Sequence, residues 1–324
     1  MSNWHQIAIE LNAAGKQPAE ITRTLNEIYD YPEVKYNAVK SFLYRAKNKV
    51  KAIKDRREAD LVKQRSVIPN LEPTVYDAEW DGAQVIRFAV MGDTQLGSKH
   101  TQLTHLHNFY DRLAAEGIDT VYHTGDIVEG LKMRVGHEYD LYVISADEMR
   151  DDVVNNYPSR PGITTYFITG NHDASIYKQV GYDLGAAIAD KRPDMKYLGR
   201  DCAIVHLTPN CTLELRHPWD GCAYALSYKL QKMIEAMESD SKPNILAVGH
   251  YHKAEYIFYR NVHALQTGCF QGQTPFMRGK GISAHPGGWI VTIRVKEDGT
   301  ILSFAPEFIP YYASIKEDYK NYRH

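Results

Sequence analysis

Residues 164–173 read TTYFITGNHD, an apolar and β-branched run that ends in a glycine followed by polar side chains. β-Branched and aromatic residues favour a strand, and a glycine lets the chain turn sharply directly after it. The turn then presents Asn171 and His172, whose amide and imidazole groups both bind metal ions. The stretch therefore predicts a buried strand with metal-binding groups just beyond its carboxyl end.

Two earlier stretches repeat this arrangement. VIRFAVMGDTQLG at residues 85–97 places Asp93 after an apolar run and a glycine, and TVYHTGDIVEG at residues 120–130 does the same for Asp126. A helical pattern over residues 101–116 separates them, and such alternation of strands and helices is typical of α/β layering. The carboxyl ends of strands in such a sheet share one edge, so we expect these side chains to lie together there.

The sequence beyond residue 196 is rich in strand patterns and adds three histidines. ELRHP provides His217, and GHYH provides His250 and His252. Two histidines that are two residues apart on an extended segment project to the same side. One helix, expected over residues 223–237, interrupts the strands.

The motifs GDTQ, GD, GNHD, a lone histidine and GHYH, in this order, resemble those of the calcineurin-like metallophosphoesterases. Each motif alone is weak evidence, but five in order, each after an apolar run, are strong evidence. The resemblance covers most of residues 83–310 and is nearest to phage and prokaryotic sequences that look like DNA-repair exonucleases. It implies a four-layer α/β/β/α sandwich, to which this chain adds a small all-α N-terminal domain.

The resemblance also implies a site for two divalent cations. In that family a hydroxide held between the ions attacks phosphorus, in line with the leaving oxygen. The implied ligands form two groups that share one carboxylate: Asp93 and His252 for the first ion, Asn171, His217 and His250 for the second, and Asp126 between them.

Two further residues of the GNHD motif have implied roles in proton transfer. By the resemblance, His172 lies over the leaving group as general acid, and Asp173 is a candidate to orient it. For the cations we expect Mn²⁺, because a mixed carboxylate, amide and imidazole site suits it. Mg²⁺, Ni²⁺, Zn²⁺ and iron are the alternatives.

The first motif departs from the family pattern at one position. The family usually has Asp-x-His there, whereas this chain has Asp93-Thr94-Gln95. An imidazole is a better donor to a transition metal than an amide oxygen, so the first ion should bind more weakly. Gln95 either ligates through its carbonyl oxygen, holds a metal-bound water or leaves the position to solvent.

The first fifty residues predict helices. Apolar spacing indicates one helix from Trp4 to Ala14, ending at Gly15, and a second from Ala19 to Ile28, after Pro18. A third, long amphipathic helix is expected from residue 35 onward. This arrangement loosely resembles a helix-turn-helix domain, although the stretch between the second and third helices is longer than the usual tight turn.

Charge is unevenly distributed along the chain. Residues 35–65 contain 11 Lys/Arg and 3 Asp/Glu, whereas the whole chain has a net charge of −2. Such a basic segment beside an acidic body favours contact with DNA. The candidate phosphate contacts lie on or beside the third helix: Lys40, Arg45, Lys47, Lys49 and Lys51. A solvated helix face, or pairing of the N-terminal helices in a homo-oligomer, would also explain the pattern.

Composition sets the remaining expectations. Apolar residues make up 44% of the 324 residues, no apolar run is long enough to cross a bilayer, and no signal-peptide pattern occurs. The four cysteines form no CxxC pair, so we expect reduced thiols and a cytoplasmic protein without membrane contact. The predicted domains are a helix-turn-helix-like region (1–50), a basic helix and linker (51–82), a phosphoesterase domain (83–310) and a tail (311–324).

These observations predict a two-metal hydrolase of phosphate esters, with the substrate open. A DNA-directed phosphodiesterase, that is a nuclease, is favoured by the GNHD motif and the basic N-terminal helices. A phosphatase or phosphodiesterase for a small molecule is the second hypothesis. A DNA-binding protein with a degenerate metal site, suggested by Gln95, is the third.

Overall fold

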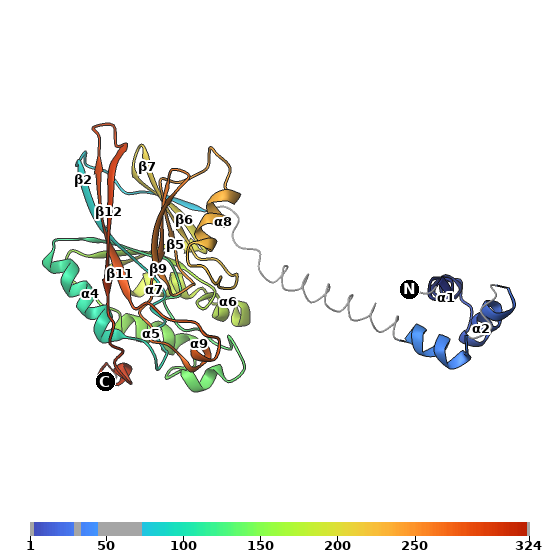
Figure 1. Ribbon diagram of the computed structural model, residues 1–324. Coiled ribbons are helices and arrows are strands. Elements are labelled where there is room, and N and C mark those ends of the chain that lie inside the picture. The colour runs from blue at the N-terminus through green and yellow to red at the C-terminus, as the bar shows by residue number, and fades with distance from the viewer. Residues whose placement is uncertain (1–2, 29–33, 45–72, 323–324) are drawn as a thin grey trace. The chain divides into compact units, whose positions relative to one another are not determined.

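The computed structural model describes residues 3–28, 34–44 and 73–322. The chain forms two compact units, residues 1–68 and residues 69–324 (Figure 1). Among the described residues, no helix is both long enough and apolar enough to cross a membrane.

The N-terminal unit contains short helices around a small apolar core. α1 (Asn3–Ala13) ends just before Gly15, whose φ of +86° is left-handed, and α2 (Pro18–Glu27) has its proline in the first turn. A further helical segment covers residues 36–44. The helices expected from the apolar spacing are therefore present, whereas the predicted continuation beyond residue 44 lies outside the described residues. The buried core residues are Ala8, Ile21, Leu25, Val34 and Val39.

The first sheet of the body has six strands in the order β12-β11-β2-β3-β4-β5. β2 to β5 run parallel, and β11 and β12 pair antiparallel beside β2. The parallel strands therefore end at the same edge. The bounds are Val85–Met91 (β2), Thr120–His123 (β3), Thr164–Thr169 (β4), Met195–Arg200 (β5), Gly287–Val295 (β11) and Ile301–Pro310 (β12).

The second sheet also has six strands, in the order β1-β6-β7-β8-β10-β9. β7, β8 and β10 run parallel, and β6 and β9 are antiparallel to their neighbours β7 and β10. β1 lies inside the region predicted to be a linker, but it pairs in parallel with β6 as an edge strand. The bounds are Thr74–Asp77 (β1), Cys202–Thr208 (β6), Cys211–Arg216 (β7), Ile245–Val248 (β8), Ala254–Tyr259 (β9) and Val262–Thr267 (β10).

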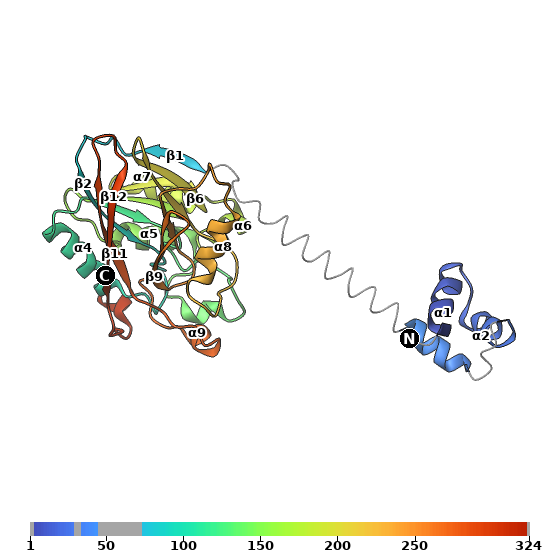
Figure 2. The same ribbon diagram turned by 45° about the horizontal axis from the view of Figure 1, so that its top comes forward.

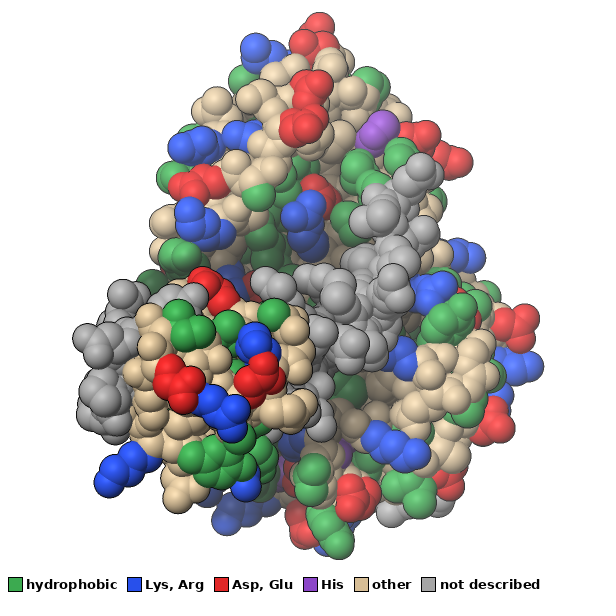
Figure 3. All heavy atoms as spheres, turned by 90° about the vertical axis from the view of Figure 1, so that its right-hand side faces the viewer, with side chains coloured by type: hydrophobic (Ala, Val, Ile, Leu, Met, Phe, Trp, Pro, Cys, Tyr) green, Lys and Arg blue, Asp and Glu red, His purple; other side chains and the backbone are tan. Residues whose placement is uncertain are grey.

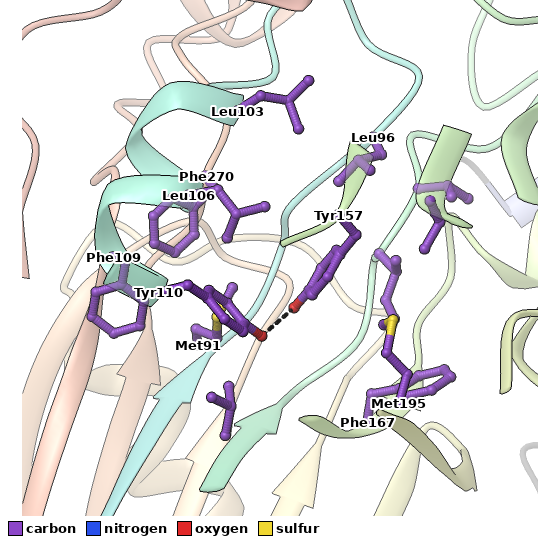
Figure 4. Close-up of a cluster of buried hydrophobic side chains, with 14 of the residues drawn as sticks. Met91, Leu96, Leu103, Leu106, Phe109, Tyr110, Tyr157, Phe167, Met195 and Phe270 are labelled. Atoms are coloured by element: carbon purple, nitrogen blue, oxygen red, sulfur yellow. Dashed lines mark hydrogen bonds between the residues drawn. The ribbon is translucent and has the colours of Figure 1, made fainter. Parts of the chain in front are cut away.

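Helices cover the outer face of the first sheet. These helices are α4 (Leu103–Ala115), α5 (Ala146–Asn156) and α7 (Leu184–Lys191) (Figure 2). Their side chains form one core with the sheet. Within it, Phe109 of α4 lies 5.6 Å from the ring of Phe270, and the hydroxyl of Tyr110 is 3.0 Å from that of Tyr157 (Figure 4). This core holds α4 and the segment after α5 against the first sheet.

The two sheets pack face to face, and one of the described helices covers the outside of the second. Phe88 and Val90 of β2 meet Leu213 and Leu215 of β7 in the core between the sheets. α8 (Tyr228–Ala236), which begins five residues later than expected, packs on the second sheet through Leu230. The layers are thus helix, sheet, sheet and helix, which confirms the predicted α/β/β/α sandwich. The remaining short helices are α6 (Ala174–Val180), α9 (Pro275–Gly279), η1 (His137–Asp140) and η2 (Asp318–Asn321).

The residues after β12 fold back on the start of α4. The backbone N–H of Ile315 donates to the side-chain oxygen of Gln102 (2.7 Å), and the hydroxyl of Thr104 donates to Asp318 (2.6 Å). Asp318 is fully buried and also accepts the backbone N–H of Thr104 (2.7 Å). Because a carboxylate at a helix N-terminus is favourable, this segment caps α4.

Candidate metal centre

The predicted ligands come together at one rim of the sandwich. Asp93, Asp126 and Asn171 follow β2, β3 and β4 of the first sheet, and His217 and the GHYH histidines follow β7 and β8 of the second. Parallel pairing within each sheet places these strand ends side by side. We name Asp93, Gln95 and His252 the first half of the centre and Asn171, His217 and His250 the second half, with Asp126 shared.

The backbone around the site is unusual. Among the described residues, eleven non-glycine residues have a positive φ, and five of them are Asp93, Gln95, Asp126, His250 and His252. Such conformations cost of order 1–3 kcal/mol each and persist where the surrounding structure enforces them. Their concentration at this rim indicates that the loops are shaped for the placement of side chains.

One glycine allows the loops after β3 and β4 to approach. A Cβ atom on Gly170 would lie 2.4 Å from Oδ1 of Asp126 and 2.6 Å from the ring of His217. Both distances are below van der Waals contact, so any other residue would push the ligands apart. The glycine of the GNHD motif is therefore required by the geometry of the site.

The second half of the centre has the spacing of a metal-binding group. Oδ1 of Asn171 lies 3.0 Å from Nε2 of His217 and 2.9 Å from Nδ1 of His250, and Nε2 of His217 lies 3.3 Å from Asp126. One nitrogen or oxygen atom from each of Asp126, His217 and His250 falls within a 4.8 Å group. With bonds of about 2.1 Å, neighbouring ligand atoms around a cation are about 3.0–3.4 Å apart. The donor set and its spacing therefore fit a divalent cation.

The first half is less complete. Nε2 of His252 lies 3.4 Å from Oδ1 of Asp93, and the amide nitrogen of Gln95 lies 3.1 Å from Asp126 and 3.5 Å from Nε2 of His252. Gln95 is fully buried, so its side chain lies within the centre. Its Oε1 and Nδ1 of His252 have no hydrogen-bond partner among the described residues. Since an unpaired buried polar atom costs about 1–3 kcal/mol, these two atoms fit contact with a bound cation or water.

Burial and neighbouring charges shift the pKa values of the site residues. Burial raises the pKa of Asp93 well above its ordinary value. Burial also opposes ionisation of Asp126, but the nearby His217 and His172 hold its pKa below the usual range. Burial would lower the pKa of His217, yet Asp126 raises it to about 10, whereas burial lowers the pKa of His252 to about 3. A cation would replace the proton on His217, because ligation requires a neutral imidazole.

His172 lies beside the centre with its ring fixed. Nδ1 donates to the backbone carbonyl of Glu129 (2.6 Å), and the backbone N–H donates to Asp126 (2.9 Å). The sequence makes Asp173 a candidate to orient this ring. Instead, the Asp173 carboxylate accepts the backbone N–H groups of residues 127, 128 and 170 (3.2, 3.0 and 2.8 Å) and so joins the loops after β3 and β4. The orienting contact comes from Glu129.

A buried polar cluster next to His172 was not predicted from the sequence. Glu129 is only 2% exposed, and it pairs with His137 (3.0 Å) and with the side-chain amide of Gln271. Glu129 is three residues from Asp126 in the GDIVEG motif, which was the one available signal. Gln271 is 142 residues away in the chain, and nothing in the sequence associates the two.

One of the five predicted DNA contacts lies within the described residues. Lys40 is exposed on the helical segment 36–44, with its ammonium group 5.8 Å from the ring centre of Tyr36. The other four candidates, Arg45, Lys47, Lys49 and Lys51, lie outside the described residues.

Comparison with known proteins finds both sequence relatives and similar solved structures. The chain is 24% identical over 234 residues to the DNA polymerase II small subunit of Halobacterium salinarum, covering 61% of this chain and 46% of the relative. It is also 24% identical over 264 residues to the subunit of the same name from Methanocaldococcus jannaschii. That match covers 68% of this chain and 43% of the relative. The chain thus matches less than half the length of these relatives.

Similar solved structures include an archaeal phosphodiesterase, with 14% identity, a TM-score of 0.38 and coverage of 69% of this chain and 100% of the other. Another is zinc-bound Vps29 from Entamoeba histolytica, with 17% identity, a TM-score of 0.35 and coverage of 69% of this chain and 99% of the other. The sequence signature described as calcineurin-like phosphoesterase matches residues 86–254, more than half of the chain. The chain therefore belongs to the calcineurin-like phosphoesterase family, which supports a metal-dependent hydrolase of phosphate esters.

Proposed function

We propose that this protein is a nuclease, a phosphodiesterase that acts on DNA with two divalent cations, preferably Mn²⁺. The observation that carries the proposal is the convergence of carboxylate, amide and imidazole donors from both sheets on one rim beside His172. Bound divalent cations would activate water and offset the negative charge that develops on the phosphate. The proposed ligands are Asp93, Gln95, Asp126, Asn171, His217, His250 and His252.

The protein's own residues supply the remaining chemistry. His172 has Nδ1 committed to the carbonyl of Glu129, so its Nε2 is the atom that can give a proton to the leaving oxygen. The backbone N–H of His172 also holds Asp126 at Oδ1, which ties the acid to the shared ligand. Asp173 holds the loops after β3 and β4 together by accepting three backbone N–H groups.

Two observations support DNA as the substrate. The relatives named above are subunits of a DNA polymerase, and residues 35–65 carry 11 basic against 3 acidic side chains. Figure 3 shows basic and acidic side chains interspersed on one face, with no extended area of one sign among the described residues in view. Because of this basic excess in residues 35–65, we assign phosphate contacts to the N-terminal unit, through Lys40, Arg45, Lys47, Lys49 and Lys51. Four unpaired cysteines suit a reducing, cytoplasmic setting.

The test combines substrates, cations and a matched variant. The purified protein is incubated with labelled single-stranded DNA, duplex DNA and nitrophenyl phosphates, each with Mn²⁺, Mg²⁺, Ni²⁺ or EDTA. We expect Mn²⁺-dependent cleavage of DNA that EDTA abolishes, and that an Asp126→Ala protein purified in parallel lacks. Absence of DNA cleavage with every cation would refute the nuclease. Turnover of nitrophenyl phosphates alone would then leave the small-molecule phosphoesterase, and no turnover of any substrate would leave a DNA-binding protein with a degenerate site.

A small-molecule phosphoesterase is the second candidate, favoured by a cavity of about 310 Å³ beside the centre. Deletion of residues 1–67 separates the two. A nuclease should lose DNA affinity, and for the full chain three to five phosphate contacts predict a log–log salt slope of about −3 to −4.5 on duplex DNA. A small-molecule enzyme should keep its turnover after the deletion. If the isolated N-terminal fragment dimerises without binding DNA, this unit is a homo-oligomerisation module.

A further inference from the structure

A cavity of about 310 Å³ opens directly beside the metal centre. Three of its lining residues, His172, His250 and His252, belong to the centre or adjoin it. A group attached to a phosphate at the centre would therefore reach into the cavity. Ligand cavities range from about 300 to 1,000 Å³, so this one is small and suits one ring system with its sugar.

Phe276, Met277 and Ile282 form an apolar part of the cavity wall. Tyr251 also lines the cavity but is only 3% exposed, so Phe276 is the accessible ring of the two. Phe276 lies on α9 and is 44% exposed, whereas its neighbour Met277 is 6% exposed and anchors the helix. Thr274 caps the same turn by accepting the backbone N–H of Met277 (3.1 Å). The ring of Phe276 is thus held in place by its helix but remains free to contact a ligand.

An arginine supports that ring. The guanidinium of Arg134 lies 4.9 Å from the centre of the Phe276 ring, pairs with Asp140 and is 3.8 Å from Glu129. Its side chain is only 19% exposed, so these contacts fix its position. Aromatic rings and guanidinium planes are the groups on which unpaired bases stack. The wall therefore offers an aromatic ring for stacking, with the guanidinium of Arg134 over that ring.

The position of His172 determines which part of the substrate faces this surface. The proposed acid lines the cavity, so the oxygen that it protonates belongs to the group inside. Hydrolysis joins the oxygen of water to phosphorus and breaks the bond from phosphorus to that leaving oxygen. The leaving oxygen takes a proton from His172, and a proton from the water restores the histidine. One water is consumed overall.

We propose that the cavity binds the base of the leaving nucleoside, stacked on Phe276, and so selects unpaired nucleotides. This inference rests on the proposed phosphodiesterase function. A cavity of this volume accepts one base and excludes a base pair, so a paired nucleotide must leave its stack before it can enter. The free energy needed to unpair and unstack the nucleotide is then required for duplex substrates alone.

Dinucleoside monophosphates provide the test, because each has a single phosphodiester and its products show which nucleoside leaves. The full-length protein with Mn²⁺ is assayed on the intact compound and on two forms that lack one base each. We expect loss of the leaving base to lower kcat/KM by about 10- to 100-fold, in line with the stacking of one base. Loss of the other base should change it by less than about threefold.

Variants at Phe276 then locate the effect. Phe276→Ala should lower kcat/KM on the intact compound by the same factor and have no further effect when the leaving base is absent. Phe276→Tyr, which keeps the ring, should retain wild-type values. Phe258→Ala serves as control, because Phe258 on β9 is 59% exposed and does not line the cavity.

The outcomes separate the two proposals. No cleavage of any compound would refute the proposed function itself. Cleavage at equal rates with and without the leaving base would refute the stacking cavity and leave the function standing. Equal losses in Phe276→Ala on both compounds would also refute it, since the ring would then act on the structure of the site. If Phe276→Ala has a lowered Tm, the comparison of wild-type rates with and without the leaving base still tests the proposal.

Discussion

The two halves of the metal centre use similar side chains but hold them differently. In the second half, the outer nitrogens of both histidines bond to backbone carbonyls: His217 Nδ1 to Thr124 (2.7 Å) and His250 Nε2 to Asp220 (2.6 Å). In the first half, Nδ1 of His252 and Oε1 of Gln95 have no partner among the described residues. A fixed outer nitrogen sets the orientation and the proton position of an imidazole. The second half is therefore organised in advance for a cation, and the first half is not.

This difference predicts that two cations bind in two steps. The second half should take up its cation first, because little free energy is needed to order its ligands. The first half, with Gln95 in place of histidine, should fill at higher metal concentration. Metal titration by calorimetry, followed by turnover at each concentration, resolves the two steps, and the variants below alter them separately.

The largest effect is expected from Asp126→Ala, which removes the ligand that both halves share. Both binding steps should disappear, and turnover should fall by at least about 10³-fold, since a metal ion contributes several kcal/mol of charge stabilisation. Metal content by mass spectrometry and DNA cleavage are the measurements. Asp190→Ala, at a carboxylate that is 73% exposed, is the control. Retention of one tight cation would show that Asp126 belongs to one half only.

His172→Ala should lower turnover by about 10²- to 10⁴-fold, the usual contribution of a general acid. Both metal-binding steps should remain, because its ring bonds to the carbonyl of Glu129 and lies outside the proposed ligand set. The loss should shrink on nitrophenyl esters, whose leaving groups need no proton. An equal loss on all substrates, or a lost cation, would contradict the acid role.

His217→Ala and His252→Ala test the two halves against each other. The first variant should abolish the tight step, and the second should weaken only the later step, by at least about tenfold. Calorimetric titration of the two variants in parallel provides the comparison. If His252→Ala removes the tight step instead, the order of filling is reversed and the backbone carbonyls are not what organises the centre.

Gln95→His should give the smallest effect, and in the favourable direction. An imidazole in place of the amide should tighten the later step by about tenfold, which corresponds to about 1.4 kcal/mol of binding free energy. Mn²⁺-dependent activity should then reach its half-maximum at lower metal concentration. Gln84→His, at an exposed position before β2, is the control. An unchanged midpoint would mean that another group completes the first half.

The sandwich could be predicted because its signals are local. Apolar runs such as VIRFAVM and TTYFIT end in glycine turns, and each turn carries a polar side chain within two residues of the glycine. The order of these motifs along the chain then placed Asp93, Asp126 and His217 at one rim before any contact was known. Local pattern and tertiary position agree here because parallel strands share one edge.

What could not be predicted depends on contacts between distant segments. β1 has no strong pattern of its own and exists through its pairing with β6, more than 120 positions later. The carbonyls of Thr124 and Asp220 that fix the histidines leave no trace in residue identity, since every residue has one. Glu129 and Gln271 meet only in the folded chain.

The hydrogen bonds at the rim also join the two sheets. Asp93 follows β2 of the first sheet, and both of its carboxylate oxygens accept the backbone N–H of His250, which follows β8 of the second (3.0 and 2.9 Å). The bond from His217 to Thr124 crosses between the sheets in the same way. The proposed metal ligands thus connect the two sheets at one edge of the sandwich. Cation supply should therefore govern local opening there, so that hydrogen exchange and protease cleavage near Gly249 slow as the centre fills, while the core between the sheets exchanges as before.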